Sequence, residues 1–150
     1  MEPNFHDSEY LIVDQLSYRI REPKRGDVII FRYPQDPSQF FIKRIIGLPG
    51  EAVRVADGRV RITDTVNAAI VQLDESPYLS SDVRTGGQTN IQLHEKEYFV
   101  LGDNREASSD SRSWGAVPKG AIMGRAWIRA WPLSRVNIFN GIAPLLLAVP

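Results

Sequence analysis

Short apolar runs alternate with polar turns along most of the chain, a pattern typical of β-strands joined by tight connections. The run 28–33 (VIIFRY) is β-branched and aromatic and stops at Pro34, and the run 39–46 has the same character. Residues 98–101 form another apolar run, and within 121–131 apolar and polar positions alternate. We therefore expect a mostly β protein with antiparallel sheets and few short helices.

Turn-forming residues separate further strands. Asp57-Gly58 lies between the alternating runs 51–55 and 59–62, and this dipeptide is one of the strongest short-range signals for a β-hairpin. Pro49-Gly50 fits a tight turn in which glycine supplies a positive φ. A shorter strand is expected at 10–13.

Two segments are less regular. Residues 63–97 are polar and rich in Ser, Thr, Asp and Gly, and we interpret them as a variable insertion with up to two weak strands. The tail from Ile138 onward is apolar, but it is too short and too interrupted by proline to span a bilayer. We expect it to dock on the core, with a weak contact to a membrane surface as the alternative. The chain of 150 residues shows no internal repeat, so one domain, residues 1–150, is expected.

Composition narrows the classes of function. Eighteen basic and eighteen acidic residues cancel, so no net charge favours nucleic acid, and we expect no nucleic-acid partner. The absence of cysteine excludes disulfides, a thiol nucleophile and cysteine metal clusters. Two histidines, His6 and His94, are too few to favour a metal site. We expect neither a metal nor a cofactor.

Lys43 stands inside the apolar run 39–46, where a merely solubilising charge is out of place. Strand alternation puts Lys43 on the same face as Phe41 and Ile45. Burial among these side chains would lower the pKa of the lysine, and a neutral amine can act as a general base. An edge-strand lysine that prevents aggregation is the alternative.

The loop 102–115 (GDNREASSDSRSWG) combines two glycines, charges of both signs and four serines directly after the strand 98–101. Such a loop is either a solvated connection or a site whose charged groups pair with one another. Its serines could supply the hydroxyl that a lysine base requires, so the loop and Lys43 are candidate partners. A Ser-His-Asp triad is poorly supported, because neither histidine lies in a suitable context.

Four segments, in order, resemble the conserved boxes of bacterial type I signal peptidases. The combination of GDNR-x-x-S-x-DSR-x-WG with IKRIIGLPG is highly specific for that family. The segments cover most of the chain outside 63–97 and the tail, and they are Met1–Pro3, Arg25–Phe31, Phe41–Glu51 and Gly102–Pro118.

The resemblance implies a membrane-anchored serine endopeptidase that removes signal peptides from exported preproteins with a Ser/Lys dyad. Its β-rich catalytic domain would lie on the extracytoplasmic side of the cell membrane, in the periplasm or outside the cell. Its partners would be the signal peptides and, through the anchor, the membrane surface.

The resemblance also assigns roles to residues. Lys43 matches the general base, and Ser108 matches the serine that hydrogen-bonds and orients this lysine. The residues that match the ion pairs bracing the loop are Asp110 with Arg112 and Asp103 with Arg44.

Positions that line the shallow apolar pockets for substrate side chains match Met1, Phe5, Phe41 and Ile42. Strict strand alternation would place Phe41 and Ile42 on opposite faces, so both assignments hold only if the strand twists between them.

The chain also departs from the family pattern. The family's nucleophilic serine stands immediately before the residue that matches Met1, and both this serine and the segment that carries the membrane anchor are missing here. We therefore expect a catalytic domain that is truncated at its N-terminus and inactive in this form. Ser8-Glu9 replaces the usual Gly-Asp, and Glu106-Ala107 replaces the usual Asp-Asn, with the loss of one polar side chain at Ala107.

Two alternative functions remain open. The chain could be a non-catalytic peptide-binding relative, or another Ser/Lys protease such as a self-cleaving repressor domain. The repressor type is disfavoured by the 102–115 motif and by the Leu48-Pro49-Gly50 turn. A serine directly before Met1, with an apolar segment further upstream, would favour the signal peptidase over the non-catalytic relative.

Overall fold

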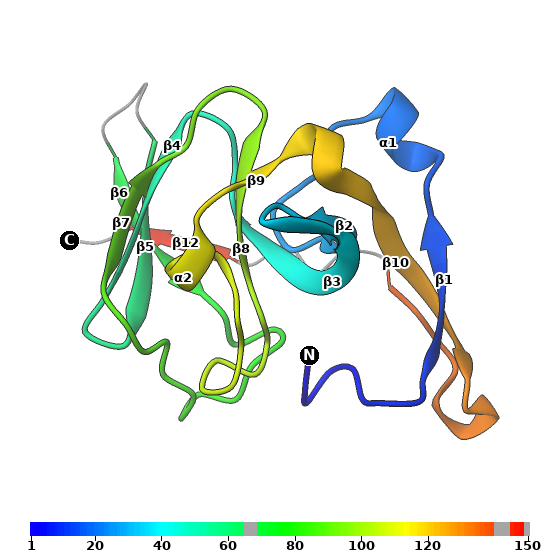
Figure 1. Cartoon of the computed structure of the whole chain (residues 1–150). Helices are drawn as coiled ribbons and strands as arrows, with labels where there is room; N and C mark the ends of the chain where they lie inside the picture. The colour runs from blue at the N-terminus through cyan, green and yellow to red at the C-terminus, as the bar shows by residue number, and fades with distance from the viewer. Residues whose placement is uncertain (65–68, 140–144, 149–150) are drawn as a thin grey trace.

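The computed structural model describes residues 1–64, 69–139 and 145–148, which form mainly two antiparallel β-sheets (Figure 1). In this described part, the larger sheet has seven strands in the order β1-β10-β2-β3-β8-β9, with β11 beside β10. The mostly β fold expected from the sequence is confirmed. The strands of the larger sheet are β1 (Tyr10–Asp14), β2 (Val28–Tyr33), β3 (Asp36–Gly47), β8 (Glu97–Leu101), β9 (Val117–Pro118), β10 (Ile122–Trp131) and β11 (Asn137–Ile138).

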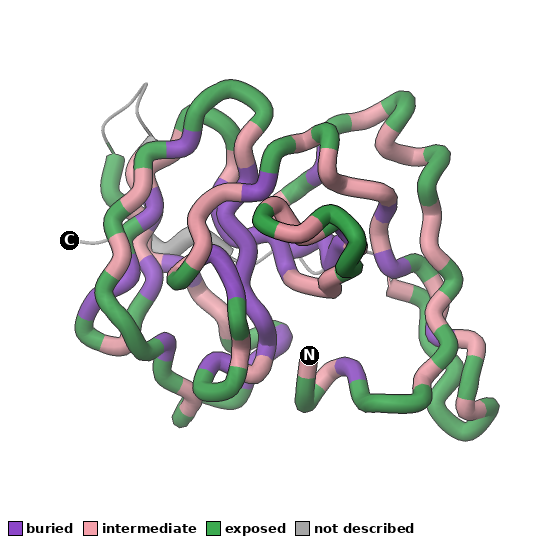
Figure 2. Tube along the Cα trace, viewed as in Figure 1, coloured by how far each residue is buried: buried purple, intermediate pink, exposed green. Residues whose placement is uncertain are grey.

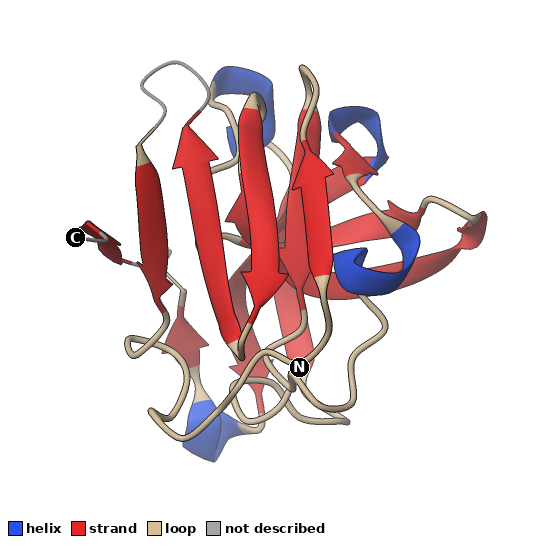
Figure 3. Cartoon of the chain, turned by 90° about the vertical axis from the view of Figure 1, so that its left-hand side faces the viewer, coloured by secondary structure: helices blue, strands red, loops and turns tan. Residues whose placement is uncertain are grey.

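The smaller sheet has five strands in the order β12-β6-β5-β4-β7, and Figure 3 shows several of them side by side. They are β4 (Glu51–Ala56), β5 (Arg59–Asp64), β6 (Ile70–Asp74), β7 (Thr89–Gln92) and β12 (Leu145–Ala148). Helical turns are short, as expected, and they are α1 (Ser17–Ile20), α2 (Ser111–Trp114) and the 3-10 turns η1 (Lys119–Ala121) and η2 (Leu133–Arg135).

The strands β3 and β8 are buried on both faces where the two sheets meet. Ile46 and Phe99 pack into an apolar cluster with the smaller sheet, whereas their neighbours Ile45 and Tyr98 pack into a second cluster on the opposite side. Buried positions accordingly concentrate along β8 and the adjoining end of β3 (Figure 2). The end of β3 that follows Lys43 is therefore held on both sides by close packing.

Two turns form as the sequence predicts. Asp57 and Gly58 both have a positive φ, 54° and 73°, which two-residue hairpin turns of type I′ require, and they join β4 to β5. Gly50 has a φ of 81° in the turn between β3 and β4. Both predictions are confirmed.

The boundary of β3 differs from the prediction. β2 coincides with the predicted run 28–33, but β3 begins at Asp36, so the expected loop 34–38 is shorter. Tyr33 pairs with Asp36, and the register shifts between Arg32 and Tyr33. Residues 37–39 consequently have no partner in β2, and this bulge accommodates Pro37, which lacks an N–H for a ladder.

The segment 63–97, interpreted as an insertion with up to two weak strands, contributes β6 and β7 to the smaller sheet. β6 lies inside this sheet, between β5 and β12, so the segment is part of the sheet rather than an appendage.

The described part of the tail docks on the core, as expected. The Phe139 ring lies 4.8 Å from the Phe5 ring, centroid to centroid, and β12 pairs with β6. The remaining tail residues, 140–144 and 149–150, lie outside the described residues. Within the described ranges, no helix is long and apolar enough to cross a membrane.

Candidate active site

Lys43 lies on β3 with its side chain between the Phe41 ring and the loop 102–115. Its Nζ is 5.5 Å from the centroid of the Phe41 ring, which agrees with the face expected from alternation. Burial lowers the pKa of Lys43, and the nearby carboxylates of Asp110 and Asp103 oppose this shift without cancelling it. Within the described part of the chain, no residue forms a hydrogen bond or ion pair with Nζ. The half-buried amine differs from the solvated lysine of an edge strand.

Asp110 organises the loop beside this lysine. Its carboxylate is fully buried and accepts hydrogen bonds from Arg112 Nε at 2.8 Å and Nη2 at 2.9 Å, and from the Gly102 N–H at 3.0 Å. It also caps α2 by accepting the Arg112 N–H. Burial alone would raise the pKa of Asp110, but the bonds from Arg112 and Gly102 outweigh burial, so the pKa lies below its usual value. The carboxylate therefore stays charged and holds the loop closed.

A second buried ion pair fixes the loop to β3. Arg44, the residue after Lys43, donates from Nε to Asp103 Oδ1 at 2.9 Å and from Nη2 to Asp103 Oδ2 at 2.7 Å. Asn4 donates a further hydrogen bond to Asp103 Oδ2 at 2.8 Å. The two ion pairs that the resemblance implies are both present, and the carboxylates of both act on the charge of Lys43.

The four predicted pocket residues separate into two groups. Met1, Phe5 and Ile42 contribute to one apolar cluster around Val28 and Ala126. Phe41 packs in a different cluster, where its ring stacks on Tyr33 at 4.6 Å. Adjacent strand residues point to opposite faces, and β3 does not twist enough between Phe41 and Ile42 to change this.

Ser108 departs from its expected contact. Its Oγ is buried and has no hydrogen-bond partner, so the expected hydrogen bond to Lys43 is absent. The hydroxyl is directed at the Cα of Gly102, because a Cβ on Gly102 would lie 2.1 Å from Ser108 Oγ and 3.6 Å from Lys43 Cδ. The Ser108 hydroxyl also has a small lowering effect on the pKa of Asp110, although its oxygen lies outside hydrogen-bond geometry with that carboxylate. Ser108 is thus next to the aliphatic part of Lys43 rather than bonded to its amine.

Sequence reasoning missed the support that the segment 63–97 gives to the loop. The buried guanidinium of Arg105 pairs with Glu75, with Nη1 at 2.9 Å from Oε2, and donates to Thr85 Oγ1. The guanidinium of Arg44 lies 4.2 Å from the centroid of the Tyr78 ring. The charge of Arg105 in the loop motif was visible in the sequence, but nothing in the local pattern around Glu75 identified its partner.

The departures from the family pattern differ in how well they suit the backbone. Ser8, where glycine is usual, has a φ of 66°, in the left-handed region that favours glycine over serine. The neighbouring Glu9 carboxylate is buried and pairs with Arg129 and Arg135. Ala107 is exposed, and its N–H still donates to Asn104 Oδ1 at 3.2 Å, so the missing polar side chain leaves this loop bond intact.

Gly102→Ala is expected to displace Ser108 and to lower the free energy of unfolding by about 1–3 kcal/mol, because the new Cβ would overlap the serine side chain. Gly120→Ala is the matched control, since a Cβ there meets no atom within 4 Å, and it is expected to stay within about 0.5 kcal/mol of wild type. Urea denaturation of the two variants measures the difference. Equal stability of both would show that Ser108 is not packed on Gly102.

Comparison with known proteins gives one consistent match. A family model described as "Signal peptidase, peptidase S26" matches residues 1–131. The chain is 39% identical over 146 residues to a probable signal peptidase I-2 of Synechocystis sp., covering 93% of this chain and 63% of that protein. It is 41% identical over 146 residues to a signal peptidase I of Leptolyngbya laminosa, covering 91% of this chain and 67% of that protein.

A solved structure is also similar. The crystal structure of a signal peptidase I from Enterococcus faecalis V583 matches with a TM-score of 0.56 and 33% identity, over 71% of this chain and 97% of that chain. The present chain thus spans 63% of the length of the Synechocystis relative and nearly all of the chain in the crystal structure.

Proposed function

The chain belongs to the signal peptidase family, peptidase S26, and on this basis we propose that it is the catalytic part of a serine endopeptidase that removes N-terminal signal peptides from exported preproteins. The observation that carries the proposal is the half-buried Lys43, whose pKa is lowered by burial beside a loop braced by two ion pairs. A lysine with a lowered pKa loses its proton more readily than a solvated lysine, and a Ser/Lys dyad requires the neutral amine.

Lys43 acts as the general base in the proposed mechanism. Its neutral amine takes the proton of a serine hydroxyl, and the serine oxygen attacks the carbonyl carbon of the scissile bond. The ammonium then returns this proton to the leaving amine, which produces an acyl-enzyme. Lys43 next takes a proton from water, the resulting hydroxide cleaves the ester, and the serine regains its hydrogen.

We place the nucleophilic serine immediately before Met1 in a longer polypeptide. Met1 lies against the loop, because the Asp103 N–H is 3.4 Å from Met1 Sδ, and Asp103 is near enough to Lys43 to influence its pKa. A residue that precedes Met1 would therefore start near the loop that borders Lys43. Ser108, beside the lysine side chain, would orient the amine once substrate and nucleophile are in place, since catalytic hydrogen bonds often tighten only in the complex.

The substrate is proposed to bind as an extended strand along β3. Pairing with β8 begins at Arg44, so on that side the backbone of 40–43 has no strand partner among the described residues. A peptide added to this edge would run next to Lys43, and its small side chains would face the cluster of Met1, Phe5 and Ile42. Preprotein signal peptides are thus the proposed partners. The domain would bind them at the extracytoplasmic side of the cell membrane, where an anchor outside this sequence would hold it.

A polypeptide that carries serine immediately before Met1 is expected to cleave a preprotein at the end of its signal peptide. The same polypeptide with alanine at that position, and the 150-residue chain itself, are expected to be inactive, because neither provides the nucleophile. Mass spectrometry of the products identifies the cleaved bond. Cleavage that does not depend on this serine would refute the proposed dyad, whereas peptide binding without cleavage by the folded serine form would favour the non-catalytic relative.

A further inference from the structure

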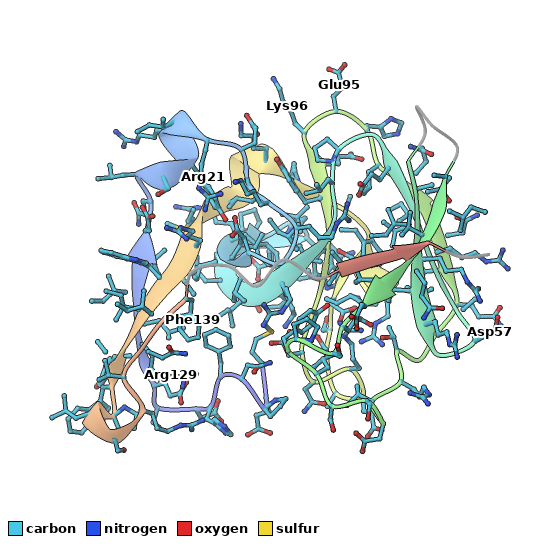
Figure 4. All side chains as sticks on the ribbon, turned by 180° about the vertical axis from the view of Figure 1, so that it is seen from behind. Arg21, Asp57, Glu95, Lys96, Arg129 and Phe139 are labelled. Carbon is cyan, nitrogen blue, oxygen red and sulfur yellow. The ribbon has the colours of Figure 1, made fainter. Side chains whose placement is uncertain are left out.

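A cavity of about 460 Å³ lies between the N-terminal segment, β10 and β11. Part of its wall is apolar and includes Phe5, Ala126 and Phe139. Figure 4 shows Phe139 and Arg129 as neighbours above the N-terminal segment. The polar part of the wall is dominated by four arginines, which are Arg44, Arg125, Arg129 and Arg135.

The arginines of the cavity are not all balanced by carboxylates. Arg44 pairs with Asp103, and Arg125 pairs with Asp14. Asp27 also lines the cavity, and its carboxylate forms an ion pair with Arg21. These three pairs are neutral and leave the remaining two guanidinium groups to a single acid.

That acid is Glu9, which is shared between Arg129 and Arg135. Arg129 Nε lies 2.8 Å from Glu9 Oε2, and Arg135 Nη1 lies 3.0 Å from Glu9 Oε1. The side chains of Glu9 and Arg129 are only 4% and 8% exposed, whereas Arg135 is 42% exposed. The cluster therefore carries one uncompensated positive charge, shared between the buried Arg129 and the exposed Arg135, and an anion that joined it would balance this charge.

Hydrogen bonding in the cluster is incomplete as well. Arg129 Nε and Glu9 Oε1 are buried without a hydrogen-bond partner. The contact of Arg129 Nε with Glu9 Oε2 and that of Arg135 Nη1 with Glu9 Oε1 therefore lack the alignment that a hydrogen bond needs. Arg129 Nη2 donates to the Asn4 carbonyl, and the guanidinium lies 5.5 Å from the Phe5 ring and 5.4 Å from the Phe139 ring. The aromatic rings and the Asn4 contact hold the guanidinium in place, with one N–H unused.

We propose that this cavity binds a phosphate ester with an apolar part. The phosphate oxygens would accept hydrogen bonds from Arg129 and Arg135, whose planar forks suit oxyanions. The volume exceeds that of phosphate alone, and Phe5 and Phe139 provide the surface for an apolar substituent. A phospholipid headgroup and a soluble phosphate ester share this chemistry. Leu133 and Ile138 near Arg135 are exposed and would lie against the acyl region of a lipid.

The proposal is independent of peptide cleavage, so its test measures binding by the 150-residue chain. One probe is glycerol 3-phosphate, whose binding is monitored through the NMR signal of Arg129 Nε–H. The other is phosphatidylcholine vesicles with or without phosphatidylglycerol, whose binding is measured by co-sedimentation. At least one of the two phosphate probes is expected to bind, and Arg135→Gln is expected to weaken this binding about fivefold or more. The exposure of Arg135 makes unfolding of this variant unexpected, and a circular dichroism spectrum verifies its fold.

Arg54→Gln is the matched control, because Arg54 is an exposed arginine on β4 that does not line the cavity. It is expected to change binding less than twofold. Binding of glycerol 3-phosphate assigns a soluble ester, and binding confined to phosphatidylglycerol vesicles assigns a lipid headgroup; both support the site. Equal losses in Arg54→Gln and Arg135→Gln would indicate diffuse charge attraction, and no binding of either probe would remove the site. Both of these results overturn the proposal whatever the outcome of the cleavage experiments.

Discussion

Lys43→Met is expected to lower the rate of signal-peptide cleavage about 10³-fold in the polypeptide that carries serine before Met1, because the variant has no amine to take the serine proton. Methionine keeps an unbranched side chain of similar length beside Phe41 and Gly102, so the packing around position 43 is preserved. Since burial disfavours the charged lysine, removal of its charge is expected to leave the free energy of unfolding unchanged or slightly higher. The loss of activity would therefore report on chemistry rather than on folding.

The pH dependence of cleavage adds a second readout for Lys43. Burial lowers its pKa from 10.5, so the active neutral amine appears at lower pH than for a solvated lysine, and the rate should rise with pH through that lowered pKa and then level off. Lys43→Arg is the control, since arginine stays protonated across this range and should show neither activity nor the rising limb. A rate within tenfold of wild type in Lys43→Met would assign the base to another residue.

The same shift has a consequence for stability. Between the lowered pKa and 10.5 the unfolded chain binds more protons at Lys43 than the folded domain. The stability of wild type relative to Lys43→Met should therefore rise with pH across this window and become constant above it. Urea denaturation at several pH values measures this difference.

Asp110→Ala is expected to lower the free energy of unfolding by about 3–5 kcal/mol, the range for breaking a buried ion pair. The substitution would leave the Arg112 guanidinium and the Gly102 N–H without their shared acceptor and would remove the cap of α2. Loss of cleavage activity should accompany the destabilisation, because the loop forms one wall around the Lys43 side chain.

Two further substitutions separate the possible causes. Asp110→Asn keeps an oxygen for the Gly102 N–H and for the cap but loses the charge, so it should cost less than Asp110→Ala. Glu106→Ala changes an exposed residue of the same loop and should stay within about 0.5 kcal/mol of wild type. If Asp110→Ala were also within that range, the loop 102–115 would be a solvated connection and Asp110 would not support the site.

Local sequence signals determined much of the fold and identified Lys43 as the proposed base. The run 28–33 gave the bounds of β2, and Asp57-Gly58 gave a hairpin turn, since alternation and turn propensity depend only on neighbouring residues. Lys43 stood out because a charge within an apolar strand is unusual. The motif around Asp110 provided the ion-pair partners through its resemblance to a family.

Contacts between distant segments were decided only by the tertiary structure. The burial of Arg105 against Glu75 depends on how the segment 63–97 folds over the loop, and no periodicity encodes that pairing. The position of Ser108 Oγ against Gly102, rather than on the Lys43 amine, depends on side-chain packing within one loop.

The cluster of Glu9 with Arg129 and Arg135 is the most distant case, because it joins the two ends of the chain across β1 and β10. In the sequence alone, nothing distinguishes any of these three residues from an ordinary surface charge. A sequence pattern records which face of a strand a side chain takes, whereas strand order and sheet packing decide which charges meet, how deeply they are buried and whether their number balances.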